Sequence, residues 1–505
     1  NSSGEGSAPH MTAGELGNGA NGGIPPVVVA TQACVKVFCT SVAPCYTLPW
    51  LRGAESHAYG SGFAVQLASG EQRLLTSAQV VENHTLVQVR RAAEAQKYVA
   101  RVECYGFDVD IAVLQVDDPQ FWEGLPVLSL GTVGLPNTMT EVLAAGFPQG
   151  GDELSTTRAN VNRVTLGGAI RELCLQVDAS ISPGTWGGPV LSLDGKLVGM
   201  ASVNQQQPQD RGYIISLPVL NTFLTNVGIG IGNGTVKPYN GKSTDCFRVQ
   251  ALENPELRIQ LGLPARPGIG DDGGVLVTKL PADSPSNGVL QEGDVLLALD
   301  GIPIAADGTV LLPNAPNGVR IGMRYLVQRA ALDSHLTYRV LRAGERRDMT
   351  VVAAPRIRHL MPPRQPVPQP QWVVLGGLVF TPLLPDYEML VPKCQLARVH
   401  EPPSFDGEQV VLLLRVLQAE VNIGYEDVCG MLETFNGEKI NSLGHLREKT
   451  NEAQATELEQ LEFRLVTGEL LVLDAAQCWE QENDIFSVHT IPCRASSDLP
   501  NRALG

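Results

Sequence analysis

The stretch that decides the fold is Ser182-Pro183-Gly184-Thr185-Trp186-Gly187-Gly188-Pro189. An apolar run that ends near Asp178 precedes it, and a second apolar run begins at Val190. Glycine accepts φ angles that other residues avoid, so a Gly-x-x-Gly-Gly-Pro turn can point several backbone N–H groups into one concave pocket. We therefore expect a tight turn between two strands, with its N–H groups gathered on one side.

Composition sets the broad class of the protein. The 505 residues carry a formal net charge of −16, and Lys and Arg form no block longer than the pairs at 90–91 and 346–347. A nucleic-acid-binding protein normally presents a basic face, so this class is excluded. The 43% hydrophobic content suffices for cores, while 52 glycines and 35 prolines favour short strands and turns. The longest apolar run, 373–384, is interrupted by glycines and falls short of the ~20 residues of a membrane span.

The cysteines indicate a reducing compartment. No Cys-x-x-Cys pair occurs, and most cysteines stand in apolar runs, as buried thiols do. No histidine accompanies the cluster at 34, 39 and 45, so we expect neither a metal site nor a cofactor. The ten positions are Cys34, Cys39, Cys45, Cys104, Cys174, Cys246, Cys394, Cys429, Cys478 and Cys493.

Hydrophobic periodicity divides the chain. Residues 1–26 are rich in Gly, Ser and Asn and predict a disordered tail. Within 27–227, two sets of about six short apolar runs predict a β-sandwich or a pair of barrels, closed by a helix. A glycine-rich linker, 228–244, follows.

The only internal repeat lies beyond the linker. Residues 293–304 and 430–440 are apolar strands that end in Asp300-Gly301 or Asn436-Gly437 turns, which predicts two related modules, 245–355 and 372–495. Between them, 356–371 is proline-rich, and we interpret it as a stiff connector rather than as an SH3 ligand. Residues 496–505 predict a frayed tail.

Several motifs together resemble one family. Residues 59–63, 75–81, 110–114 and 184–189 stand in the order and spacing of the HtrA/Deg proteases, and 293–301 looks like the core of a PDZ domain. Segments at 253–258, 321–326 and 422–426 are similar to the plant and algal branch with two PDZ domains. The resemblance implies a mainly β protein, in which a trypsin-like double β-barrel precedes two α+β PDZ domains, in an assembly built from trimers.

The chain departs from this family where the chemistry should be. The family's general base is a His in a Thr-x-Ala-His motif, and Gln79 stands there; the nucleophilic Ser is replaced by Trp186. A carboxamide cannot take a proton from a hydroxyl near neutral pH, and an indole is no nucleophile. Asp110 keeps the orienting carboxylate but has no imidazole to orient. The sequence thus predicts vestigial triad positions within a remnant oxyanion turn whose glycines are Gly184, Gly187 and Gly188. We expect the Trp186 ring to fill the substrate cleft.

A relocated catalytic pair is the alternative that the sequence leaves open. His57 and His84 belong to the same domain, and Ser182 precedes Trp186 by four positions. Triad geometry tolerates little displacement, so we interpret both histidines as ordinary surface residues.

The PDZ modules suggest a second kind of chemistry. A PDZ domain adds an extended peptide to a sheet edge and takes its terminal carboxylate on backbone N–H groups. In the first module, the predicted loop and strand are Gly273, Gly274, Val275, Leu276 and Val277. In the second, Glu408 replaces the glycine and would repel a carboxylate, so we interpret that module as structural.

Three functions follow as hypotheses. The favoured one is an inactive Deg-like scaffold or partner subunit that associates with itself or with related Deg subunits and holds unfolded or C-terminal peptide segments. The alternatives are a serine endopeptidase of protein quality control with an unorthodox site, and an ATP-independent holding chaperone. Because the chain does not begin with Met, we expect an organellar protein, in the chloroplast stroma ahead of the mitochondrial matrix, with the nucleus left open.

Overall fold

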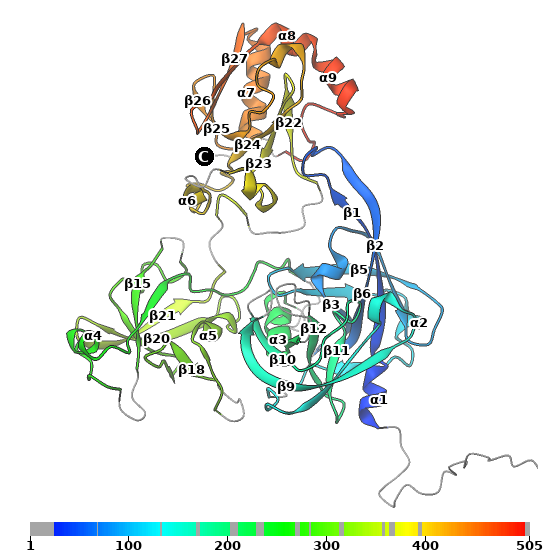
Figure 1. Ribbon diagram of the computed structural model, residues 1–505, viewed down its shortest axis with the longest axis vertical. Helices are drawn as coiled ribbons and strands as arrows, with labels where there is room; N and C mark the ends of the chain where they lie inside the picture. The colour runs from blue at the N-terminus through cyan, green and yellow to red at the C-terminus, as the bar shows by residue number, and fades with distance from the viewer. Residues whose placement is uncertain are drawn as a thin grey trace, which may run out of the picture.

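A computed structural model of the chain describes residues 25–499, except for 68, 132–133, 168–171, 203–210, 229–236, 268–272, 282–283, 313–317, 356–358, 363–368 and 392–395. Two β-barrels lie side by side, the first PDZ domain lies beside them, and the second PDZ domain lies at the far end of the molecule (Figure 1). Residues 1–24 of the predicted N-terminal tail, 229–236 of the linker, 356–358 and 363–368 of the connector and 500–505 of the predicted C-terminal tail fall outside the described residues. The C-terminal tail is not frayed from 496 onward as predicted, because Ser496 and Leu499 are buried and the Ser496 N–H donates to the Trp372 carbonyl.

The first barrel is a seven-stranded sheet in the order β1-β4-β5-β6-β3-β2-β7, which closes because β1 also pairs with β2. Its interior is filled by alternating apolar side chains, among them Val35, Leu74, Val89 and Leu114. The strands are β1 (Cys34–Pro44), β2 (Arg52–Gln66), β3 (Gln72–Thr76), β4 (His84–Arg91), β5 (Tyr98–Gly106), β6 (Ile111–Gln115) and β7 (Leu128–Ser129).

The second barrel closes in the order β10-β13-β12-β11-β8-β9. Helix α3 (Leu217–Asn226) follows β13 directly and packs its buried residues, including Leu220 and Phe223, against the barrel. The predicted pair of barrels with a closing helix is confirmed. The strands are β8 (Glu141–Gly146), β9 (Ser155–Gly167), β10 (Glu172–Val177), β11 (Pro189–Ser192), β12 (Leu197–Ser202) and β13 (Gly212–Ser216).

The first PDZ domain is built on an antiparallel sheet in the order β14-β15-β16-β20-β21. The Asp300-Gly301 turn, with φ of 49° and 76°, joins β16 to the short strand β17, as the repeat predicts. The elements are β14 (Arg248–Ala251), α4 (Pro255–Gln260), β15 (Val275–Lys279), β16 (Val295–Leu299), β17 (Ile302–Pro303), β18 (Thr309–Leu311), β19 (Arg320–Gly322), α5 (Arg324–Gln328), β20 (His335–Arg342) and β21 (Glu345–Val352).

The second PDZ domain repeats this plan with an extra strand, in the order β22-β23-β24-β25-β27-β28. The apolar run 373–384 forms the hairpin of β22 and β23, and it turns at Gly376-Gly377 with φ of 52° and 81°. Among the described residues, no helix is both long and apolar enough to cross a bilayer. The elements are β22 (Val373–Leu375), β23 (Leu378–Pro382), η4 (Pro385–Leu390), α6 (Leu396–Val399), β24 (Val411–Val416), β25 (Gly430–Phe435), β26 (Glu438–Lys439), α7 (Leu443–Ala455), β27 (Gln460–Leu465), β28 (Leu470–Asp474), α8 (Ala475–Glu480) and α9 (Glu482–His489).

A long hairpin links the first barrel to the second PDZ domain. Strands β1 and β2 pair from Cys34↔Phe63 out to Pro44↔Arg52, and the outer half of this ribbon leaves the barrel and reaches the second PDZ domain (Figure 1). The sequence predicted only the inner parts of these strands. Residues 52–57 are all exposed and therefore show no apolar alternation from which a strand could be read.

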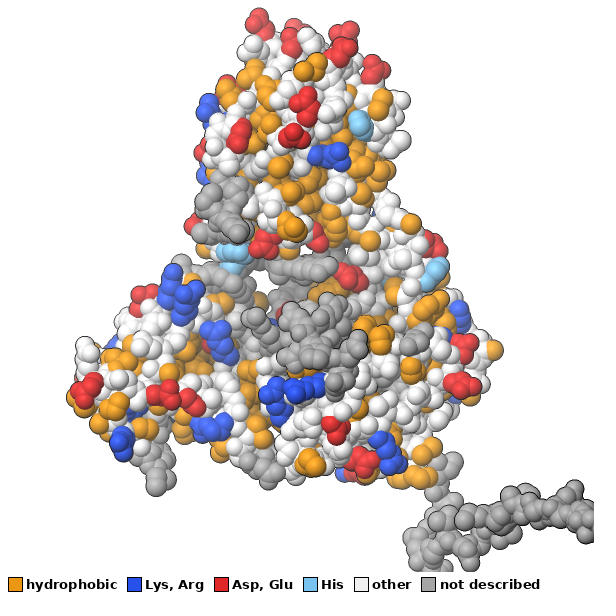
Figure 2. All heavy atoms as spheres, in the orientation of Figure 1, with side chains coloured by type: hydrophobic (Ala, Val, Ile, Leu, Met, Phe, Trp, Pro, Cys, Tyr) orange, Lys and Arg blue, Asp and Glu red, His pale blue; other side chains and the backbone are white. Residues whose placement is uncertain are grey.

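The surface agrees with the composition. On the face shown in Figure 2, Lys and Arg side chains are scattered and interspersed with Asp and Glu, and acidic side chains gather at the far end of the second PDZ domain. Because the basic side chains form no continuous stripe on this face, it offers no electrostatic track for a phosphate backbone.

We expect Gly188→Ala to destabilise the barrels strongly. A Cβ at this position would lie 2.1 Å from the Ala145 carbonyl oxygen, which belongs to β8 and cannot move alone. Denaturant unfolding should show a loss of about 2–4 kcal/mol. The matched control is Gly124→Ala, where φ is 68° but no atom lies within 4 Å, and which should cost only about 1–2 kcal/mol. Equal losses in the two variants would contradict the close packing of this turn.

Candidate functional site

The carboxylate of Asp110 accepts hydrogen bonds from both barrels at the junction between them. Ser77 Oγ donates to Asp110 Oδ1 over 2.6 Å, and the Gln79 backbone N–H donates to the same oxygen over 3.2 Å. From the second barrel, Ser202 Oγ donates to Oδ2 over 3.4 Å. Strand β3 ends at Thr76 and a single 3₁₀ turn, Ala78–Val81, follows it, which directs the Gln79 N–H toward the carboxylate.

All of these partners are neutral. Asp110 is fully buried, and burial raises its pKa to about 6, against the opposing effect of the hydrogen bonds from Ser77, Gln79 and Ser202. No cation appears among the described groups that act on this carboxylate. The site therefore holds a buried acid that nothing positively charged compensates, which is costly when the acid ionises.

The turn at 184–188 is held by Ser61 of the first barrel. The Ser61 N–H donates to the Trp186 carbonyl over 3.0 Å, and Ser61 Oγ donates to the Gly184 carbonyl over 2.7 Å. The Phe147 N–H in turn donates to Ser61 Oγ over 2.9 Å. One serine thus fixes the turn to the first barrel at Gly184 and at Trp186.

The same turn touches the segment that carries Gln79. Gly187 has a φ of 82°, and a Cβ there would lie 2.6 Å from the Ser77 backbone nitrogen and 2.4 Å from the Ser61 carbonyl oxygen. Only glycine allows this approach. The structure therefore brings the predicted positions Gln79, Asp110 and Trp186 to one place, and it keeps the Gly184, Gly187 and Gly188 frame.

The turn retains donors for a carbonyl oxygen. Gly187 N–H donates to Ala201 O and Gly188 N–H to Thr185 O, whereas no acceptor among the described residues takes the N–H of Gly184 or Trp186. Two such donors can bind a peptide carbonyl. Trp186 is half-buried, so its indole is only partly covered.

The other candidate nucleophiles and bases lie elsewhere. His57 Nδ1 is 3.4 Å from Thr40 Oγ1 on the exposed hairpin, and His84 Nδ1 is 2.9 Å from the Val81 carbonyl oxygen. Ser182 is exposed. Cys34 lies against the Ala145 carbonyl, but burial raises the pKa of its thiol far above the usual range, which keeps it unreactive. The structure therefore brings none of these side chains to Asp110.

Comparison with known proteins identifies the family. Residues 60–200 match the trypsin-like peptidase domain, and residues 361–498 match a PDZ domain. The chain is 34% identical over 487 residues to Protease Do-like 2, chloroplastic, of Arabidopsis thaliana, which covers 93% of this chain and 75% of that protein. It is 31% identical over 470 residues to Protease Do-like 4, mitochondrial, of the same plant, covering 92% and 84%. The chain belongs to the Deg/HtrA family of Do-like proteases.

The solved HtrA-type protease AlgW with a decapeptide is 23% identical, with a TM-score of 0.46, and the match covers 66% of this chain and 98% of that one.

The first PDZ domain of this Do-like chain offers a sheet edge, but not where the sequence predicted it. Val275, Leu276 and Val277 in β15 are paired on both sides, with β14 and β16, and the Gly274 N–H already donates to the Ile304 carbonyl. This corrects the predicted peptide site at Gly273–Val277, because a peptide strand needs an open edge. The described sheet ends at β14 and at β21, and β14, which is mostly exposed, is the end strand that lies next to β15.

In the second PDZ domain, the strand equivalent to β14 is β23, and it does not lie at the edge of the sheet. Strand β23 pairs with β22, and β22 is in turn bridged to the C-terminal segment at Val373↔Ala495, with the Val374 N–H donating to the Arg494 carbonyl. Strand β24, which contains Val411 and Leu412, lies inside the sheet. The chain thus supplies its own added strand at this edge.

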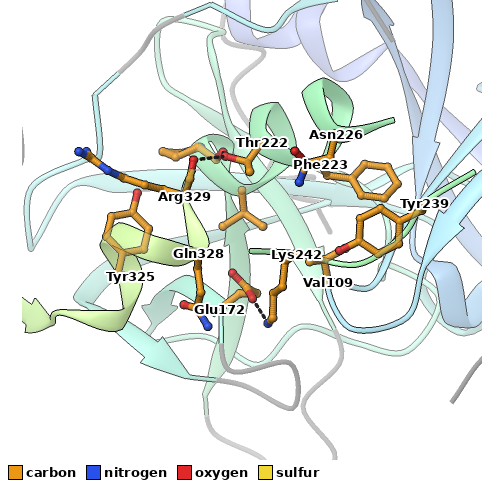
Figure 3. Close-up of a pocket in the computed structure, with 12 residues that line it drawn as sticks. Val109, Glu172, Thr222, Phe223, Asn226, Tyr239, Lys242, Tyr325, Gln328 and Arg329 are labelled. Atoms are coloured by element: carbon orange, nitrogen blue, oxygen red, sulfur yellow. Dashed lines mark hydrogen bonds and ion pairs between the residues drawn. The ribbon is translucent and has the colours of Figure 1, made fainter. Parts of the chain in front are cut away.

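A small pocket joins the first PDZ domain to the second barrel (Figure 3). It holds about 20 Å³, room for one water molecule, between α3 and α5. Glu172 is ion-paired with Lys242, the Tyr239 hydroxyl donates to Asp108 over 3.1 Å, and Thr222 Oγ1 donates to the Arg329 carbonyl over 3.4 Å. The sequence reasoning missed these residues, since each is an unremarkable polar residue until the two domains meet.

We expect Asp110→Asn to stabilise the protein at neutral pH and not at low pH. A raised pKa means that the folded state holds the Asp110 proton more tightly than the unfolded chain does. The stability that this proton gives the natural protein is fully present below pH 3.8 and is lost as the pH rises through about 6. Asparagine keeps the hydrogen-bonding capacity and tolerates the φ of 54°.

Urea unfolding at a series of pH values measures this effect. Above pH 7 the variant should be more stable by about 2–3 kcal/mol, and the two proteins should converge near pH 4. A variant that is less stable than the natural protein above pH 7 and equally stable near pH 4 would show that a cation compensates Asp110 in the folded protein.

Proposed function

We propose that this Do-like chain is a catalytically inactive member of its family, which holds polypeptide and acts as a scaffold or partner subunit. The observation that carries the proposal is the set of groups around Asp110. The neighbours of this carboxylate are Ser77, Ser202 and the Gln79 backbone, and the turn that touches them presents Trp186.

Peptide hydrolysis by a serine protease needs a base that takes the proton of the nucleophile and returns it to the leaving amine. The Gln79 carboxamide is not basic enough for this step, and the Trp186 indole offers neither a lone pair for attack nor a transferable proton. What remains at the site is the pair of N–H groups of Gly184 and Trp186 and a buried acid. These can bind an extended backbone, but they cannot form an acyl intermediate.

The second candidate function is proteolysis. The two Arabidopsis relatives bear the names of proteases, and Ser61 and the glycines of the turn keep a frame on which a triad could act. Proteolysis at this site would have to use Ser77 Oγ as its nucleophile, since this hydroxyl lies 2.6 Å from the Asp110 carboxylate. Asp110 is a much weaker base than imidazole, so it would activate Ser77 poorly.

A holding-chaperone role belongs to the same proposal, because both roles require the chain to bind unfolded polypeptide. The exposed edge of β14 and the N–H groups of Gly184 and Trp186, which no acceptor among the described residues takes, are two places where an unfolded segment can add its backbone. For location, the names of two relatives specify chloroplast and mitochondrion, and we infer an organellar site, with the chloroplast stroma favoured.

The test is labelling by a fluorophosphonate probe, which reacts only with an activated serine. We expect no labelling of the natural chain. The double variant Gln79→His/Trp186→Ser restores the residue types of a triad beside Asp110, and it should be labelled, because the frame that orients them is present.

Each single variant serves as a matched control and should label at least about 10²-fold more slowly than the double variant. Adding Asp110→Asn to the double variant should suppress labelling again. Labelling of the natural chain that disappears in Ser77→Ala would contradict the proposal and establish the protease reading.

A further inference from the structure

A cleft of about 510 Å³ opens on the second PDZ domain, where three segments of the chain meet. These segments are the connector, the stretch between β23 and β24, and the C-terminal residues 496–498. Cavities of about 300–1,000 Å³ are the usual size of ligand sites. None of the described residues that line this cleft belongs to the site around Asp110 or to β14, so it is a separate place on the molecule.

The floor of the cleft is apolar and held in place by hydrogen bonds. Trp372, Leu383 and Leu384 line it and are buried. The Trp372 N–H donates to Ser496 Oγ over 3.3 Å, and the Ser496 N–H donates to the Trp372 carbonyl over 3.0 Å. The Leu383 N–H donates to the Val410 carbonyl over 2.8 Å. Because these bonds join the three segments without a ligand, the floor is formed in advance and a ligand does not have to order it.

Three carboxylates, those of Asp406, Glu408 and Asp498, also line the cleft. Asp406 and Asp498 are exposed, and Glu408 is half-buried. Gln371 Nε2 donates to Asp498 Oδ2 over 3.2 Å, and the Ser404 N–H donates to Glu408, so neither hydrogen bond brings a positive charge. No lysine or arginine is among the described residues that line the cleft. An apolar floor with an acidic rim is complementary to a ligand that is both apolar and cationic.

The acids are spread around the cleft and do not converge on one point. In the part of the chain that the structure describes, no three Asp, Glu, His or Cys side chains come close enough together to hold a metal ion. Glu408 also borders a small neighbouring pocket with Arg398 and Lys439. Asp406 and Asp498, which belong to two different segments, therefore provide most of the charge that a ligand meets. A ligand with several cationic groups can reach both acids, whereas one compact cation cannot.

We propose that this cleft binds a basic segment of another polypeptide, in which lysine or arginine alternates with apolar residues. The apolar side chains and the aliphatic stems of the basic ones cover the floor, and the charged ends reach Asp406 and Asp498. Glu408, which disfavours the terminal carboxylate of a peptide in this domain, favours such a ligand. The inference extends the proposed holding of polypeptide to a second site, and it does not depend on whether the barrels are catalytically active.

Fluorescence anisotropy on the full chain tests the site with a labelled octapeptide of alternating lysine and leucine. The peptide is amidated at its C-terminus, so that it has no terminal carboxylate for a PDZ loop to bind. We expect saturable binding that weakens as salt is added, because the rim contacts are exposed ion pairs. In the triple variant Asp406→Asn/Glu408→Gln/Asp498→Asn, the Kd should rise about tenfold, since three such pairs are lost together. Unfolding curves check that the variant is folded.

The matched control is Glu420→Gln/Asp427→Asn/Glu433→Gln, which removes the same charge from exposed residues of the same domain that do not line the cleft. It should change the Kd less than about twofold. A lysine–serine octapeptide should bind about tenfold more weakly than the lysine–leucine one, because it leaves the floor uncovered.

Three results overturn the proposal. They are no binding of the lysine–leucine peptide, equal weakening in the two triple variants, and equal affinity of the lysine–serine peptide. Displacement of the peptide by lysinamide at the same concentration of charge would assign the cleft to small organic cations, which also overturns a polypeptide ligand. None of these results bears on labelling by the fluorophosphonate probe, so the two proposals fail independently.

Discussion

The close contact between the glycine turn of the second barrel and the backbone of the first is the constraint on which the site depends. Gly187 and Gly188 allow carbonyl and amide groups of Ser61, Ser77 and Ala145 to approach within distances that no side chain permits. Ser61 then ties the turn down through both its N–H and its hydroxyl. Because this frame is made of backbone and glycine, it survives whatever side chain stands at position 186.

Asp110 shows how neutral hydrogen-bond partners leave the charge of a buried carboxylate uncompensated. A carboxylate that orients an imidazole is compensated when the imidazole is charged, whereas here the neighbours are hydroxyls and an amide. Burial then raises its pKa, so ionisation of this acid lowers the stability of the folded protein near neutral pH. Its hydrogen bonds join the start of β6 to the segment after β3 and to β12.

The two PDZ domains use the same strand edge in opposite ways. In the first, β14 ends the sheet and is largely exposed; in the second, β22 covers the equivalent strand β23 and is itself covered by the C-terminal segment. The second domain instead packs an apolar surface against the turn of the β1–β2 hairpin, where Trp50 is buried beside Trp372 and Tyr387. The sheet of the first PDZ domain thus keeps an exposed end strand, while the second PDZ domain makes its contact with the hairpin through an apolar surface.

The sequence by itself determined the β-rich class, the repeated module and the identity of the residues at the site, whereas its short apolar runs allowed a β-sandwich or two barrels, and the family resemblance implied the barrels. Glycine spacing, Asp-Gly and Asn-Gly turns and short apolar runs are local signals, and backbone geometry follows from them directly. Only the tertiary structure decided which strand of the first PDZ domain is an edge, because residues 275–277 read as a strand whether or not partners lie on both sides. It also decided where the β1–β2 hairpin ends, since the exposed residues 52–57 show no apolar alternation. Trp50 at the hairpin turn is buried against residues more than 300 positions away in sequence, and its Nε1 donates to the His489 carbonyl. Pairing and burial between distant segments are set by packing, and no local pattern encodes them.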